Sequence, residues 1–141
     1  MAQKLTFDSG IQSFDINDKC TVEFNPTDLN VAERMYNAFS MLADKQDEFE
    51  TARGEKMSAK EFFEFSHKRD TEMREILDGL FNTPISEPLF GGMNVYAMSG
   101  GIPVWCNLMF ALLDVLSDSV KSEAARTNDR LDKYTQKYRR K

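Results

Sequence analysis

Histidine and cysteine are scarce in this chain of 141 residues, which has one histidine, His67, and two cysteines, Cys20 and Cys106. Many catalytic and metal-binding sites depend on these two residue types. The sequence contains no Cys-x-x-Cys pair, no His-Glu-x-x-His motif and no second histidine to complete a set of ligands. We therefore expect buried structural thiols, no catalytic residue, no metal site and no cofactor.

Charge is missing from one long segment, although 29% of all residues are charged. The twenty-six residues of Pro88–Leu113 include no aspartate, glutamate, lysine, arginine or histidine. A membrane span needs about 20 mostly apolar residues, whereas this segment contains four glycines, two prolines and three other polar residues. Its apolar part, Ile102–Leu113, is about half the required length and includes Asn107. We expect a buried core helix there and no membrane span.

An excess of positive charge is also missing, because the net charge is −5. General nucleic-acid binding is therefore not expected, since it depends on neutralising phosphates. The charge is uneven: the segment from Lys121 onward has eight basic and three acidic residues, or +5, which leaves −10 for the other 120 residues. We interpret the basic end, Lys133–Lys141, as a solvated helix terminus. The opening MAQKLTFDSG has no apolar stretch typical of a signal peptide, so a cytoplasmic protein is expected.

Apolar residues make up 41% of the chain, with eleven phenylalanines and eight methionines, and this composition predicts a folded protein. The length fits a single domain over residues 1–141. We predict a mainly α (α+β) fold with three main helices and an extended C-terminal helix. Its parts are a small β-sheet over residues 1–25, a helical body over 26–120 and a polar, basic helical tail over 121–141.

The predicted sheet consists of short segments separated by turn residues. Leu5–Phe7, Ile11–Ile16 and Cys20–Phe24 are the strands, and Asp8-Ser9-Gly10 and Asn17-Asp18 are the turns. Two strands would form an antiparallel hairpin and three a meander. So small a sheet needs an apolar surface to pack on, and the helices must supply it.

Three helices are predicted from apolar spacing and from capping residues. The first starts at Asn25–Asp28, where Asn or Thr caps it, and ends near Gly54; Ser58 begins the second with a Ser-x-x-Glu box. The third starts at Gly100–Pro103 and continues past Leu116 as a narrow apolar stripe. The residues expected in the core are Met35, Phe39, Phe62, Phe65, Trp105, Leu108, Met109, Leu112 and Leu116. The apolar stripe of the first helix also includes Leu29 and Tyr36.

A connector, Asn82–Gly101, precedes the third helix and contains one helical turn around Glu87–Phe90. Its glycine pairs match no phosphate-binding motif, so we interpret them as turns. The only candidate catalytic residues are Asp114 and His67, and both are expected to face solvent.

Aromatic residues are the main candidates for contact with a partner. Phe62, Phe63 and Phe65 cannot share one helix face, because position 63 lies about 100° from position 62. Either a broad stripe is buried or Phe63 is exposed to a partner, and the broad stripe is favoured. The candidate partner-binding residues are Phe49, Phe63, Leu131, Tyr134 and Tyr138.

Two segments carry a family resemblance. FDINDKCTVEFNPTDLNVAERMYNAF (Phe14–Phe39) and LFGGMNVYAMSGGIPVWCNLMFALLD (Leu89–Asp114) resemble a family of small Firmicutes phage and prophage proteins that is similar to siphophage tail assembly chaperones. The resemblance covers about three quarters of the chain and fades in the last twenty-five residues. Neither segment is a catalytic motif.

The resemblance implies a cytosolic assembly factor that coats the tape measure protein, keeps it soluble and helps to recruit tail tube proteins. It also implies that a longer, frameshifted form can exist. Two alternatives stay open: a structural virion component, such as a tail or head–tail connector protein, and a prophage regulator or small enzyme. We expect homo-oligomers, through a sheet edge at Leu5–Phe7 or the narrow C-terminal stripe.

Overall fold

The structure is a computed structural model that describes residues 1–126, 130, 131 and 133. It has the predicted mainly α (α+β) fold, with long helices, one short helix and small antiparallel hairpins. The elements in chain order are β1 (Gln12–Ile16), β2 (Cys20–Phe24), α1 (Leu29–Arg53), α2 (Ala59–Asp78), α3 (Ser86–Phe90), β3 (Met98–Ser99), β4 (Ile102–Pro103) and α4 (Val104–Ala124).

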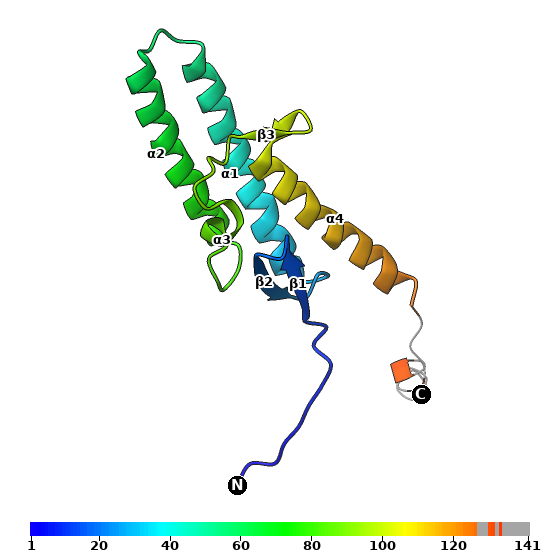
Figure 1. Ribbon diagram of the computed structural model, residues 1–141. Coiled ribbons are helices and arrows are strands. Elements are labelled where there is room, and N and C mark those ends of the chain that lie inside the picture. The colour runs from blue at the N-terminus through cyan, green and yellow to red at the C-terminus, as the bar shows by residue number, and fades with distance from the viewer. Residues whose placement is uncertain (127–129, 132, 134–141) are drawn as a thin grey trace.

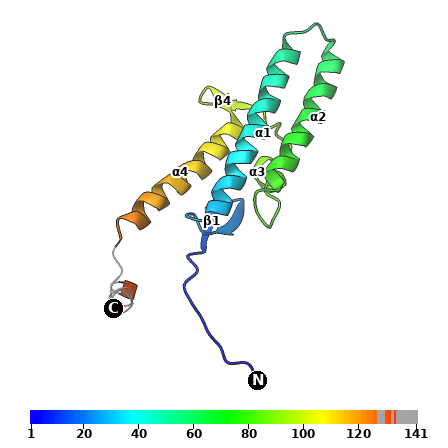
Figure 2. The same cartoon turned by 180° about the vertical axis from the view of Figure 1, so that it is seen from behind.

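The long helices form an elongated body. Helices α1 and α2 lie side by side as an antiparallel pair, and α4 crosses α1 obliquely and then diverges from it (Figures 1 and 2). The β1–β2 hairpin lies beside the N-terminal half of α1, and the connector with α3 lies along α2 (Figure 1).

The ends of α1 and α2 follow from local capping. Ser58 accepts a hydrogen bond from the Glu61 amide at 3.1 Å, as the Ser-x-x-Glu box predicts. The cap of α1 is Asp28, which accepts from the Asn30 amide at 2.9 Å, and not Asn25 or Thr27 as predicted. The reason is that the side-chain Oδ1 of Asn25 already accepts from the amide of Thr27 at 2.8 Å.

The core lies where α1, α2 and α4 meet. Met35, Trp105, Met109, Leu112 and Leu116 are buried, as expected. Four further members of the predicted core are partly buried and pack against it: Phe39, Phe62, Phe65 and Leu108.

The predicted stripe of α1 is wrong at two positions. Leu29 and Tyr36 are 81% and 69% exposed. They are seven residues apart and share one face of the helix, whereas the buried line runs through Val31, Met35 and Ala38. The described part of the chain leaves the Leu29 face open to solvent.

The N-terminal sheet is a hairpin and not a meander, because β1 begins at Gln12 and residues 1–11 form no strand. The chain turns at Ser9-Gly10, where the Asn25 side-chain amide donates to the Ser9 carbonyl at 2.9 Å. Gly10 has φ of +72°, in the left-handed region that favours glycine. This corner directs the preceding residues away from the body (Figure 1).

A second hairpin replaces the predicted helix start at Gly100–Pro103. Strands β3 and β4 pair through Met98 with Pro103 and Ser99 with Ile102. The two turn residues, Gly100 and Gly101, have φ of +66° and +86°, as a two-residue hairpin turn of this kind requires. Helix α4 therefore starts at Val104.

The C-terminal helix extends past Leu116, as predicted, and α4 ends at Ala124. Leu131 is helical and 62% exposed. Tyr134 and Tyr138, and most of the predicted tail over 121–141, lie outside the described residues.

Substitution on α4 should separate its buried and exposed faces. Met109 is fully buried, so Met109→Ala should lower the free energy of unfolding by about 2–5 kcal/mol through lost contacts and a cavity. Asp114 is exposed, and Asp114→Ala should change it by less than about 0.5 kcal/mol. Urea unfolding measures both, and equal effects would contradict this assignment of the core.

Candidate interaction surface

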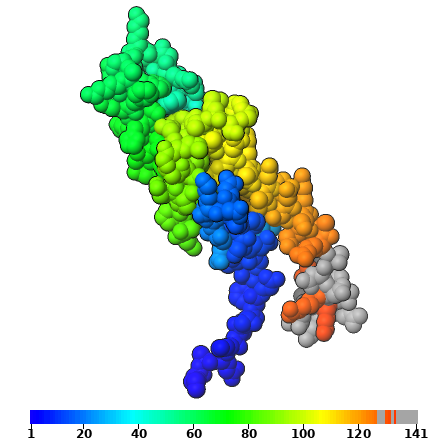
Figure 3. Space-filling view, viewed as in Figure 1, coloured from blue at the N-terminus to red at the C-terminus, as the bar shows by residue number. Residues whose placement is uncertain are grey.

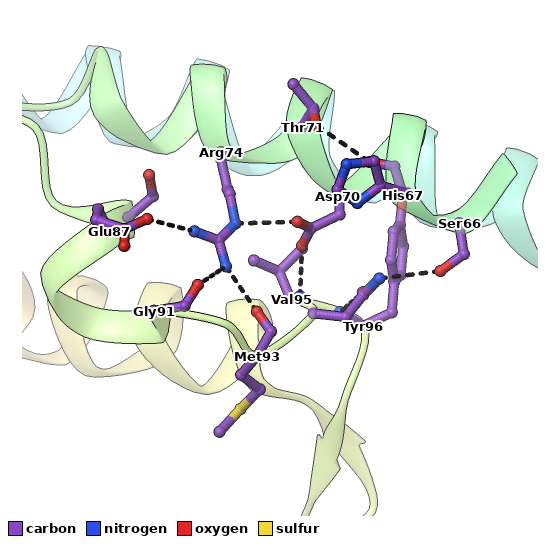
Figure 4. Close-up of polar contacts among 12 residues, drawn as sticks. Ser66, His67, Asp70, Thr71, Arg74, Glu87, Gly91, Met93, Val95 and Tyr96 are labelled. Carbon is purple, nitrogen blue, oxygen red and sulfur yellow. Dashed lines mark hydrogen bonds and ion pairs between the residues drawn. The ribbon is translucent and has the colours of Figure 1, made fainter. Parts of the chain in front are cut away.

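The arrangement closest to an active site is a buried acidic residue paired with an arginine on α2. Asp70 is only 7% exposed. Its Oδ2 accepts from Arg74 Nε at 3.0 Å, and its Oδ1 accepts from the Val95 amide at 2.7 Å (Figure 4). The carboxylate therefore has partners on both oxygens.

The guanidinium of Arg74 binds the connector. Its Nη2 donates to the carbonyls of Gly91 and Met93, each at 2.7 Å, and its Nη1 lies 3.5 Å from Glu87 Oε2 (Figure 4). These contacts use the nitrogen atoms that could otherwise hold an anion. The Asp70–Arg74 pair acts as a clamp on the connector.

The clamp belongs to a longer row of polar residues spaced four apart on α2. Ser66 accepts from the Asn94 side-chain amide at 2.9 Å, one turn before Asp70. Asp78, one turn after Arg74, accepts from the amides of Ile85 and Ser86 at 2.9 and 2.7 Å. We call Ser66, Asp70, Arg74 and Asp78 the α2 polar row.

Sequence reasoning missed the α2 polar row, although a signal was present. Asp70 lies three residues before Met73 and seven before Leu77, so it continues their buried line. An acidic residue on an apolar line with an arginine four residues later is the signature of a buried, paired charge.

Phe49 is buried and is not a partner-binding residue, which corrects the prediction. It is 5% exposed, and its ring stacks on Tyr96 with centroids 4.0 Å apart. Phe62 and Phe65 lie 5.9 Å from it on the other helix. The connector carries Tyr96 onto Phe49 and closes this aromatic cluster.

The hydroxyl of Tyr96 is buried and has no hydrogen-bond partner among the described residues. Burial disfavours the charged phenolate and raises the pKa of Tyr96 to about 12. The ring therefore serves packing more than polar chemistry.

The remaining candidate reactive residues do not converge. His67 and Asp114 are both exposed and lie on different helices. Burial raises the pKa of the Cys20 and Cys106 thiols, and both cysteines are free. Within residues 1–126, 130, 131 and 133, no three metal-binding side chains lie close enough to hold an ion.

An apolar groove lies between α1 and α2. It has a volume of about 600 Å³, an apolar floor and a charged rim. We call its apolar lining residues the floor, namely Ala38, Met41, Ile76 and Leu80, and its charged lining residues the rim, namely Arg34, Lys45, Glu72 and Glu75. Met41 is 52% exposed.

The rim of the groove is held in place by polar contacts from α1 to α2 and to the chain just after α2. Lys45 Nζ lies 2.7 Å from Glu72 Oε2, and this hydrogen bond lowers the pKa of the Glu72 carboxyl. Arg34 Nη1 donates to the Leu80 carbonyl at 3.0 Å. The groove is therefore a preformed surface with both signs of charge along its edges.

Phe63 is 68% exposed, so the broad buried stripe favoured from the sequence is wrong, and contact of Phe63 with a partner stays a prediction. It lies at the edge of a polar hollow of about 470 Å³ beside His67 and Arg74. Sequence reasoning did not identify Met41, because it lies outside the apolar stripe of α1.

Comparisons of this chain with protein-family models, with curated proteins and with solved structures find no match. None of the helices within the described residues is both long and apolar enough to cross a membrane.

The clamp should contribute strongly to stability. Arg74→Met leaves a buried carboxylate without its counter-charge and should cost about 3–5 kcal/mol of unfolding free energy. Lys68→Met removes the same charge from an exposed position of α2 and should cost less than about 0.5 kcal/mol. Thermal and urea unfolding test this, and similar costs for both variants would show that the clamp is unimportant.

Tyr96 should make stability fall at high pH. Its folded pKa of about 12 exceeds the ordinary value of 10.0, so its contribution is complete below pH 10 and is lost between pH 10 and 12. Tyr96→Phe should match or exceed wild-type stability at pH 7 by up to about 1 kcal/mol, and should lack this loss. Urea unfolding across this pH range gives the difference in unfolding free energy between Tyr96→Phe and the wild type. A difference that stays constant from pH 10 to pH 12 would contradict the prediction and would show that the hydroxyl is hydrated.

Proposed function

We propose that this protein is a phage tail assembly chaperone-like binding protein that holds the tape measure protein and helps tail tube assembly. The observation that carries the proposal is the α1–α2 groove, with its apolar floor and charged rim. The resemblance of Phe14–Phe39 and Leu89–Asp114 to phage proteins similar to tail assembly chaperones names the partner.

The groove suits an amphipathic helix. Such a helix places apolar side chains three and four residues apart on one face, and that face fits between two parallel ridges of a helix pair. Met41 has an unbranched, polarizable side chain that adapts to different apolar surfaces. This property suits a partner that presents many similar but unequal helical segments.

The charged rim supports recognition of orientation. Arg34 and Lys45 come from α1, whereas Glu72 and Glu75 come from α2. A bound helix with charges of both signs therefore has a preferred direction in the groove. The Asp70–Arg74 clamp is engaged with the connector, which supports a role in binding over one in catalysis.

Co-expression with the tape measure protein tests the proposal. The wild-type chain should raise the soluble fraction of the tape measure protein and co-purify with it. Met41→Glu places a charge on the groove floor and should reduce co-purification at least about tenfold. Met98→Glu makes the same change at a residue 61% exposed on the β3–β4 hairpin and should behave as wild type. Absence of co-purification with the wild-type chain would refute the proposal.

A structural virion component is the second candidate, and the exposed apolar residues Leu5 and Phe7 favour it because subunits of assemblies exchange such segments. Mass spectrometry of purified particles separates the two candidates. A chaperone should be absent from mature particles, whereas a tail or connector subunit should be present at a constant copy number.

A further inference from the structure

The chain before the corner at Ser9-Gly10 forms an extended arm that projects from the body (Figures 1 and 3). Leu5 and Phe7 are 85% and 80% exposed. In the part of the chain that the structure describes, no residue makes a hydrogen bond to residues 1–7. The arm thus presents apolar side chains together with unpaired backbone donors and acceptors, which is the state of a strand without its sheet.

The arm is amphipathic with a period of two. Leu5 and Phe7 point to one side of an extended chain, and Lys4 and Thr6 point to the other. Six residues in this conformation reach about 20 Å. This length is sufficient to pair along all five residues of β1.

The β1 edge of the sheet matches the arm. Within the described chain the sheet has two strands only, so β1 has no neighbour on its outer side. Val22 and Phe24 of β2 are 1% and 6% exposed, whereas Phe14 and Ile16 of β1 are only partly buried. Apolar surface therefore stays open along β1, and a further strand carrying apolar residues would cover it.

The polar faces are complementary in charge. The outer face of the hairpin exposes Asp15 on β1 and Glu23 on β2. An added strand that turns Leu5 and Phe7 toward Phe14 and Ile16 would place Lys4 on this acidic face. Opposite charges on neighbouring strands stabilise pairing.

The corner prevents the arm from pairing with its own β1. The Asn25 side chain holds the Ser9 carbonyl, and a Cβ on Gly10 would lie 2.6 Å from Asn25 Nδ2, so the backbone there is tightly seated. Asp8 accepts from the Gly10 amide at 2.9 Å and fixes the direction in which the arm leaves. The strand that pairs with the arm must therefore belong to another molecule.

We propose that residues 3–8 of one copy add as a third strand to the β1 edge of a second copy of this chain. Leu5 and Phe7 cover Phe14 and Ile16 of that copy, Thr6 lies opposite Asp15, and Lys4 lies diagonally from Asp15 on the same face. Main-chain hydrogen bonds supply affinity, and the alternating side chains supply register. The pairing does not depend on the groove between α1 and α2.

Paired arm variants of the full chain test the proposal. Phe7→Lys and Thr6→Lys add the same charge to adjacent residues on opposite faces of the arm. Phe7→Lys should weaken self-association at least about tenfold, whereas Thr6→Lys should retain it because residue 6 would lie opposite Asp15 of β1. Sedimentation velocity over a concentration series gives the association constants, and circular dichroism checks that both variants keep the helical fold.

Hydrogen exchange measured by mass spectrometry locates the contact. In the associated wild-type protein, the amides of residues 3–8 and the outer edge of β1 should exchange slowly, and dilution or Phe7→Lys should remove this protection. A wild-type protein that stays monomeric with unprotected arm amides would overturn the proposal. Equal association of Phe7→Lys and wild type, or equal loss in both variants, would also overturn it.

Discussion

The fold depends on four polar side chains of α2 that hold the connector. Residues 88–101 carry glycines and prolines and form little regular structure, so their backbone groups find few partners of their own. The α2 polar row supplies such partners to Gly91, Met93 and Val95. Residues 88–101 carry no charged side chain, and the charged groups that bind their backbone, Asp70 and Arg74, lie on the neighbouring helix.

Held in this way, the connector organises the core around it. It presses Tyr96 onto Phe49 and so closes the aromatic cluster between α1 and α2. It also sets the start of α4, since the Val104 amide donates to the Ala97 carbonyl at 2.7 Å. Trp105 then enters the core and donates to Gln46 of α1 at 2.9 Å. One interaction on α2 thus positions a helix more than twenty residues later in the chain.

The spacing of apolar residues predicted the core correctly where one face of a helix is buried along its length. The apolar spacing of α4 predicted Trp105, Met109, Leu112 and Leu116 in the core, and the Ser58 box predicted the start of α2. The spacing of apolar residues did not predict burial or exposure where the side chain that covers a residue comes from a distant part of the chain. Phe49 is buried by Tyr96, forty-seven residues later, and the groove around Met41 exists only because α1 and α2 leave a gap between them.

The sequence by itself determined the class of fold, the end of α1 near Gly54, the start of α2 at Ser58 and the buried face of α4, because capping and helical periodicity act within a few residues. It also determined that Pro88–Leu113 is no membrane span, since length and glycine content suffice for that. Only the tertiary structure decided that Asp70 and Arg74 form a buried clamp and that Phe63, and not Phe49, faces solvent. It also decided that residues 1–8 form no strand of the sheet. These outcomes depend on contacts between segments far apart in the chain, and the spacing of residues within one segment does not encode them.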